Sequence, residues 1–275
     1  MGAVRLLTTL IAAAFLAGCG GTDEADDRQT VVAGFYPLAW AAERIGGQDF
    51  RVVNLTPAGA EPHDLELSPR DVAAIRGADL VAYVGGGFQP ALEDAVADRD
   101  GASLDVLGRA EDPHVWLDPI RFAEIAQEIG AALGRPASGE DLAVALQALD
   151  EELSSGLGQC ERRTLVTTHA AFGRLAARYG LTALSLAGRS PESEPSPQEL
   201  ERLVEKVRAS RATTVFVEPL VSDRLAETVA REAGTEVAVL DPVEGLSQER
   251  LDAGEDYLSV MRSNLTVLRR ALGCR

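Results

Sequence analysis

The feature that most constrains the fold of this chain is the alternation of short apolar, β-branched runs with amphipathic helical stretches. Strand-like runs are expected at 30–35, 51–56 and 80–85 in the first half, and at 164–169, 183–188, 213–218 and 236–241 in the second half. Helical stretches are expected near 37–46, 69–77, 89–98, 171–179, 197–210 and 221–233. Strands that alternate with helices in this way are typical of parallel α/β architecture.

A long helical stretch separates the two halves. Residues 119–159 have a helical pattern throughout, except for a break at "GRPASGED". The simplest assembly is an α/β fold of two lobes, each with a parallel-type βα sheet, joined by linker helices. We therefore expect an N-terminal lobe at 30–118, linker helices at 119–159 and a C-terminal lobe at 160–275.

The N-terminus is typical of an exported protein. Residues 1–18 combine a basic residue, Arg5, with an apolar run that is too short for a stable membrane span, which predicts a signal peptide. The sequence "LAGC" resembles a bacterial lipobox, in which the cysteine, here Cys19, is lipidated on its thiol and becomes the new N-terminus after cleavage; an ordinary signal with an incidental cysteine is the alternative. Residues 19–29 are polar and predict a flexible tether. The expected location is extracytoplasmic, with a lipid anchor in the bacterial cell membrane.

Two further cysteines remain once Cys19 is assigned to the lipid. Exported chains with two cysteines usually pair them, so a disulfide between Cys160 and Cys274 is expected. It would join the last helix to the start of the second half. Two free thiols are the alternative.

The formal net charge of the chain is −17. Phosphate binding requires a basic surface, so this charge argues against nucleic acid as a partner. An acidic surface favours cations in a general way but does not form a site.

The candidate functional residues lie where the predicted strands end, and ligands of parallel α/β sheets collect at those ends. His63 follows the run 51–56 after a short loop, His169 ends the run 164–169, and Asp241 ends the run 236–241. His114, in "EDPHVWLDP", lies in the turn before the linker helices. All four residues therefore fall at the cleft expected between the lobes.

Each of these four residues also has an ordinary structural explanation. His63 is compatible with an exposed loop, His114 with a packed turn, His169 with a helix cap and Asp241 with a turn before proline. However, the sequence contains only three histidines, and none lies elsewhere. Three imidazoles and one carboxylate form a closed, four-coordinate set that suits Zn²⁺.

Several longer segments resemble one protein family. They are "FYPLAWAAERIGGQ", "GAEPHDLELSPRDVAAIRGADLVAYVGGGFQPAL", "DPHVWLDP", "TTHAAFGRLAARYGL", "GRSPESEPSPQEL", "VFVEPLVS" and "VAVLDPVEGL". In this order they are similar to the cluster A-I substrate-binding proteins of zinc and manganese ABC transporters. The resemblance implies two α/β lobes bridged by one long helix, at 139–158, with metal held between the lobes. The ligand positions of the family fall on His63, His114, His169 and Asp241.

The resemblance also bears on the cargo and the partners. Histidine at the third ligand position, His169, resembles the zinc binders, whereas many manganese-selective members carry glutamate there. Zn²⁺ is therefore the implied cargo, with Mn²⁺ or mixed specificity as the alternative. Many zinc members carry a histidine-rich loop between the first two ligands, but residues 87–113 contain no histidine here. The implied partner is a membrane permease of the ABC type, and we expect a monomer.

Ligand histidines usually donate their second ring N–H to a carboxylate or carbonyl group. Glu61, Asp118 and Glu218 are the candidates for this role. Asp118, which precedes Pro119, is also typical of a helix N-cap.

The sequence argues against two other classes of protein. A secreted zinc hydrolase keeps an open water position on its metal, whereas Asp241 would close the coordination sphere. The sequence contains no H-E-x-x-H, G-x-S-x-G or G-x-x-x-x-G-K-[ST] pattern. Because the metal would have no open position and these motifs are absent, we expect a protein that is not an enzyme.

A surface adhesin would need a patch that binds a partner, and no segment of the sequence marks such a patch.

Overall fold

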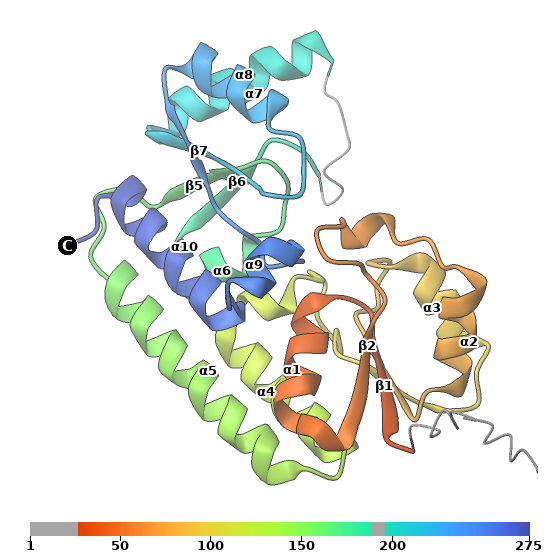
Figure 1. Ribbon diagram of the computed structural model, residues 1–275. Coiled ribbons are helices and arrows are strands. Elements are labelled where there is room, and N and C mark those ends of the chain that lie inside the picture. The colour runs from red at the N-terminus through yellow and green to blue at the C-terminus, as the bar shows by residue number, and fades with distance from the viewer. Residues whose placement is uncertain (1–26, 189–195) are drawn as a thin grey trace, which may run out of the picture.

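Two α/β lobes stand on a shared base of helices in the computed structural model, which describes residues 27–188 and 196–275 (Figure 1). The predicted signal peptide and Cys19 lie outside the described residues. Within the described ranges, no helix is both long enough and apolar enough to cross a membrane.

The N-terminal lobe contains a parallel four-stranded sheet in the order β2-β1-β3-β4. Its strands are β1 (Gln29–Ala33), β2 (Phe50–Asn54), β3 (Leu80–Tyr83) and β4 (Ala102–Asp105). Its crossover helices are α1 (Tyr36–Gly46), α2 (Pro69–Gly77) and α3 (Pro90–Ala97). Val32 and Val81 of the sheet pack against Ile75 of α2 and Leu92 of α3. The opposite face of the sheet packs against α1.

Strand β4 is absent from the predicted elements. It is an edge strand whose residues are exposed or only partly buried, so its sequence "ASLD" shows no apolar run. Its strand conformation depends on pairing with β3, from Leu80↔Ala102 to Tyr83↔Asp105. Local sequence therefore carries little information about this strand.

The C-terminal lobe repeats the architecture with a second parallel sheet in the order β6-β5-β7-β8. Its strands are β5 (Thr164–Thr167), β6 (Thr182–Ser185), β7 (Thr214–Val217) and β8 (Glu236–Val239). Its crossover helices are α6 (Gly173–Arg178), α7 (Pro197–Ser210) and α8 (Arg224–Ala233). Helices α7 and α8 cover the outer face of this sheet (Figure 1).

Helices α4 (Pro119–Ala132), α5 (Pro136–Leu157) and α10 (Tyr257–Leu272) form the base. The break between the linker helices is shorter than the predicted "GRPASGED", because α5 already begins at Pro136 and includes "PASGED". Pro136 takes the first position of α5, where a missing N–H costs nothing. Helices α4 and α5 pack so closely that a Cβ on Gly130 would lie 2.8 Å from the Cα of Gly139. Figure 1 shows α5 running from beneath the N-terminal lobe to the C-terminal lobe.

One hydrophobic core continues through the base into both lobes. Trp40 of α1, Phe122 of α4 and Tyr257 of α10 form a cluster in which the ring centroids lie 4.8–6.0 Å apart. Helices from the N-terminal lobe, the linker and the C-terminus therefore share one aromatic contact. This shared core opposes a wide hinge motion of one lobe against the other.

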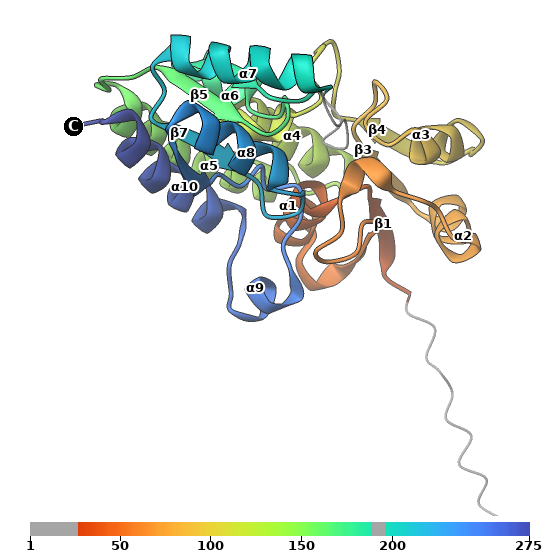
Figure 2. The same cartoon turned by 90° about the horizontal axis from the view of Figure 1, so that it is seen from above.

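The predicted disulfide is confirmed. Cys160 and Cys274 are bonded, with an S–S distance of 1.99 Å, and they close a separation of 114 residues. The bond fixes the end of α10 beside the segment that follows α5. Helix α9 (Gln248–Asp252) lies on the connection from β8 to α10 and projects away from both sheets (Figure 2).

Candidate metal centre

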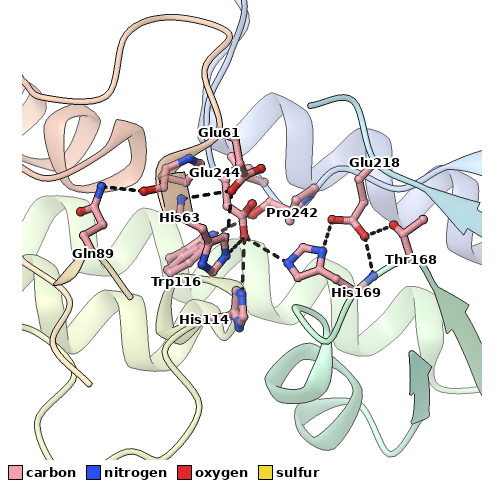
Figure 3. Close-up of polar contacts among 12 residues, drawn as sticks. Glu61, His63, Gln89, His114, Trp116, Thr168, His169, Glu218, Pro242 and Glu244 are labelled. Carbon is pink, nitrogen blue, oxygen red and sulfur yellow. Dashed lines mark hydrogen bonds and ion pairs between the residues drawn. The ribbon is translucent and has the colours of Figure 1, made fainter. Parts of the chain in front are cut away.

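Four residues from distant segments of the chain meet between the lobes (Figure 3). His63 lies in the short helix η2 (Pro62–Asp64) after β2, and His114 precedes the short helix η3 (Val115–Leu117). His169 follows β5 and Glu244 follows β8. Each offers one ligand atom, and these atoms all lie within 4.8 Å of one another.

The distances from the Glu244 carboxylate to the three histidines suit a small tetrahedral ion. The Oε1 atom of Glu244 lies 3.7 Å from Nε2 of His63, 3.5 Å from Nε2 of His114 and 3.6 Å from Nε2 of His169. For ligands about 2.05 Å from a tetrahedral Zn²⁺, neighbouring ligand atoms lie about 3.3 Å apart. The observed distances are close to that value.

These four ligand atoms are buried, and none has a hydrogen-bond partner among the described residues. A buried polar atom without a partner costs about 1–3 kcal/mol. Four such atoms directed at one point are therefore unfavourable unless a cation satisfies them together. The donor set, three imidazole nitrogens and one carboxylate oxygen, fits Zn²⁺.

The imidazole of His169 is held from behind by Glu218. Nδ1 of His169 lies 2.5 Å from Oε2 of Glu218, and the other carboxylate oxygen, Oε1, accepts hydrogen bonds from the backbone N–H of His169 and from the hydroxyl of Thr168. Burial opposes a positive charge on His169, but the adjacent carboxylates of Glu218 and Glu244 outweigh burial and raise the pKa of His169 to about 10. Without metal, His169 is therefore protonated at neutral pH.

His114 has a comparable carboxylate behind it. Its Nδ1 lies 2.8 Å from Oδ1 of Asp112, which also accepts the backbone N–H of His114 at 3.1 Å. Burial would raise the pKa of Asp112, but the hydrogen bonds with His114 outweigh it and lower that pKa. An ionised Asp112 keeps the proton on Nδ1 and leaves Nε2 free for a metal.

Two glutamates lie beside the histidines. Burial opposes ionisation of Glu244, but the neighbouring imidazoles of His169 and His63 outweigh burial and lower the pKa of Glu244, so Glu244 is a carboxylate. Glu61 accepts the backbone N–H of His63 at 3.2 Å and lies 4.0 Å from Nε2 of that residue. Burial and the neighbouring charge of Glu244 raise the pKa of Glu61 to about 7. Near neutral pH, Glu244 is therefore charged, whereas Glu61 is only partly ionised.

Apolar rings and one amide fix the surroundings of the cluster. Phe88 contacts the rings of both His63 and His114, and Trp116 contacts that of His114. The buried amide of Gln89 donates to the carbonyl of Pro62 at 3.2 Å, which connects η2 to the residue that precedes α3 (Figure 3). In this apolar setting, electrostatic attraction to a cation is stronger than it is in water.

Asp241, the predicted fourth ligand, does not join the cluster. One of its carboxylate oxygens lies 2.6 Å from Nη1 of Arg250, and the other accepts the backbone N–H of Val243 at 2.7 Å. The carboxylate that faces the histidines belongs to Glu244, three residues further along. The prediction placed the ligand at the first acid after β8, but the chain continues past Asp241 before it turns into the cleft. The sequence signal for this carboxylate was the glutamate of "DPVEGL", which is Glu244.

The three predicted supporting acids lie in different settings. Glu218 contacts His169 and Glu61 contacts His63, as described above. Asp118 instead caps α4, where it accepts the backbone N–H groups of Ile120 and Arg121 at 3.1 and 3.4 Å. Asp112 was not predicted, yet it is the acid that supports His114. Its position two residues before a candidate ligand was the only sequence signal for this role.

Comparisons with known proteins agree with this arrangement. The family described as "Zinc-uptake complex component A periplasmic" matches residues 31–271. The chain belongs to this family. The resemblance seen in the sequence is therefore confirmed, and so is the predicted α/β fold with two parallel-sheet lobes.

Individual relatives are similar over most of this chain. The zinc-binding lipoprotein AdcA of Streptococcus pneumoniae serotype 4 is 32% identical over 98% of this chain and 61% of its own length. The chain thus spans about three fifths of that relative. The high-affinity zinc uptake system protein ZnuA of Bacillus subtilis is 30% identical, with 96% of each chain covered. The crystal structure of the Zn(II)-bound ZnuA-like domain of Streptococcus pneumoniae AdcA superposes with a TM-score of 0.74 at 34% identity, covering 89% of this chain and 99% of that one.

Proposed function

We propose that this protein is the substrate-binding component of a zinc ABC transporter, which captures Zn²⁺ between its lobes and delivers it to a membrane permease. The observation that carries this proposal is the buried cluster of His63, His114, His169 and Glu244, whose ligand atoms lie within 4.8 Å of one another. Membership of the zinc-uptake family supports the same function.

The donor set favours zinc over manganese. Three imidazole nitrogens and one carboxylate oxygen suit the tetrahedral preference of Zn²⁺, whereas Mn²⁺ prefers more oxygen ligands and higher coordination. Carboxylates behind His114 and His169 fix both rings with Nε2 toward the ion and make them stronger donors.

The same four residues support a carrier rather than an enzyme. Catalytic zinc typically has three protein ligands and an open position for water. Here Glu244 supplies a fourth ligand atom and would close the coordination sphere. We therefore propose binding and release of the ion without chemical turnover.

Metal exchange is proposed to occur at the His63 side of the site. The side chains of His63 and Glu61 are 11% and 12% exposed, whereas those of His114, His169 and Glu244 are at most 1% exposed. We propose lobes at 30–118 and 160–275, with the linker helices at 119–159 limiting motion to loops and small lobe shifts. A large hinge rotation of one lobe against the other between metal-free and zinc-loaded crystals would contradict this description.

The location is proposed from the sequence, since Cys19 lies outside the described residues. Lipidation of Cys19 would anchor a monomer on the outer face of the cell membrane, next to the permease. The test is fractionation of cells that express the full chain: the wild type should remain with the membranes, and Cys19→Ser should be recovered in the soluble exported fraction.

The test of metal binding is the metal content of the soluble chain from residue 20 after equal exposure to Zn²⁺ and Mn²⁺ at neutral pH. We expect one zinc per molecule, and we expect Glu244→Ala to lose it. Arg262→Ala is the matched control, because Arg262 pairs with Glu152 on the surface of the helical base. One manganese per molecule would reverse the proposed cargo, and no bound metal would contradict the proposal.

A further inference from the structure

The residue before Glu244 adopts an unfavourable backbone conformation. Val243 has a φ of 58°, and the only other non-glycine residue with positive φ in the described ranges is Arg211, which ends α7. The left-handed region is disfavoured for a β-branched side chain, and such strain persists only where neighbouring contacts hold it. The turn at Val243 must therefore be stabilised from outside.

Asp241 supplies the stabilising contacts. Its side chain accepts the backbone N–H of Val243 at 2.7 Å and so closes a turn around Pro242. Its own backbone is held on both sides by Asn264, through one hydrogen bond of 3.0 Å and one of 2.7 Å. Arg250 of α9 binds the second carboxylate oxygen of Asp241 at 2.6 Å. Asp241 is thus fixed in the orientation that Val243 requires.

The chain on either side of Glu244 is tied to other elements as well. The indole N–H of Trp116 donates to the carbonyl of Pro242 at 2.7 Å (Figure 3). The backbone N–H of Gly59 donates to the carbonyl of Leu246 at 3.0 Å. Given these ties, the left-handed turn at Val243 decides where the Glu244 carboxylate points.

We propose that Asp241 and Arg250 are positioning residues for zinc. Arg250 orients Asp241, Asp241 holds the left-handed turn at Val243, and the turn directs Glu244 to the three histidines. This inference rests on the proposed function, because it assigns a role in zinc binding. It gives α9, which projects from the surface, a direct connection to the metal ligand (Figure 2).

The inference predicts a loss of zinc affinity and a specific rescue. Arg250→Ala should weaken zinc binding about tenfold, or by about 1.4 kcal/mol, because Asp241 then no longer holds the strained turn at Val243 firmly. Adding Val243→Gly to that variant should restore affinity to within about threefold of the wild type, because glycine adopts a φ near 58° without strain. A residue needed only for general folding would not be rescued in this way.

The measurements are zinc affinity by chelator competition, the visible spectrum of the Co²⁺-loaded protein, and hydrogen exchange of the Val243 amide in the metal-free protein. In Arg250→Ala the Co²⁺ spectrum should change and the Val243 amide should exchange faster; in the control Arg262→Ala both should match the wild type. Should Arg250→Ala fail to fold, Arg250→Lys keeps the charge but loses the planar geometry, and should show smaller changes in the same direction.

Unchanged affinity, Co²⁺ spectrum and amide exchange in Arg250→Ala would overturn the inference, and so would a loss of affinity that Val243→Gly does not rescue. A wild type with a protected Val243 amide but no zinc binding would instead overturn the proposed function and leave the contact between Asp241 and Val243 established. The exchange measurement therefore separates the two failures.

Discussion

His63 and His169 face the same point from opposite lobes, yet their imidazoles are supported differently. His169 is fully buried, and Glu218 binds its Nδ1 at 2.5 Å. His63 is 11% exposed at its side chain, and no acid of the described chain lies within ion-pair distance of its Nδ1. Its support comes through the backbone, from Glu61 on its own N–H and from Gln89 on the carbonyl of Pro62.

The difference suggests that the His169 side and the His63 side of the site have different roles. A carboxylate behind a ligand imidazole fixes its orientation and raises its basicity, so the His169 side is organised before metal arrives. The His63 side is more accessible and less restrained, which suits the entry and exit of an ion. Variants on the two sides should therefore have unequal effects.

The largest effect is expected for His169→Ala. This change removes a proposed ligand and leaves the buried carboxylates of Glu218 and Glu244 without the imidazole that they contact. Zinc affinity should fall by more than about a hundredfold, beyond the range typical of supporting residues. Chelator competition should show a smaller loss for His63→Ala; an equal or larger loss there would contradict the asymmetry.

Glu218→Gln should lower zinc affinity by about 10–100-fold, because His169 loses the charged acceptor that orients it. Asp118→Asn is the matched control: it also replaces a predicted supporting acid, and asparagine still caps a helix. Isothermal titration should find that control unchanged. A strong effect of Asp118→Asn with none for Glu218→Gln would reverse the assignment of the supporting acids.

Zinc affinity should rise about tenfold for each pH unit between pH 6 and 9, because zinc must displace the proton that His169 holds with a pKa of about 10. The same proton also affects folding. Because the pKa of His169 is raised from 6.5, the folded metal-free protein binds this proton more tightly than the unfolded chain does. Its contribution to the free energy of unfolding is complete below pH 6.5 and is lost as the pH rises through 10. Proton release measured during zinc titration checks the coupling. No release at pH 7 would show that His169 is neutral before zinc binds.

The smallest effect on zinc is expected at the disulfide, which lies away from the cluster. Replacing both Cys160 and Cys274 with serine removes a cross-link over 114 residues. The free energy of unfolding should fall by about 2–5 kcal/mol, mainly because the unfolded chain gains freedom. Zinc affinity should stay within about threefold, as measured on the folded variant; a larger loss would connect this bond to the site.

The sequence predicted the elements with strong local patterns and missed those that depend on partners. Buried strands such as β5 and β7 are continuous apolar runs, so their positions were predictable within one or two residues. Edge strand β4 has mostly exposed residues and owes its conformation to pairing with β3. The three histidines could be placed at the cleft because strand ends in parallel sheets meet there.

The carboxylate that completes the cluster could not be predicted from the sequence alone. Asp241 and Glu244 lie in the same segment after β8, and spacing alone does not decide which one faces the cleft. The choice depends on Arg250, which binds Asp241, and on the left-handed turn at Val243, which redirects the chain. Both are tertiary features without a local sequence pattern. Asp112 was missed for a similar reason, because its role depends on the orientation of the His114 ring.

The most direct test of the central claim is a zinc-edge anomalous diffraction map of the zinc-loaded crystal. The account predicts one zinc peak, with Nε2 of His63, His114 and His169 and a carboxylate oxygen of Glu244 about 2.0–2.2 Å away. Asp241 should remain paired with Arg250 in the same map. A peak coordinated by Asp241 instead of Glu244, or one away from the three histidines, would contradict the account.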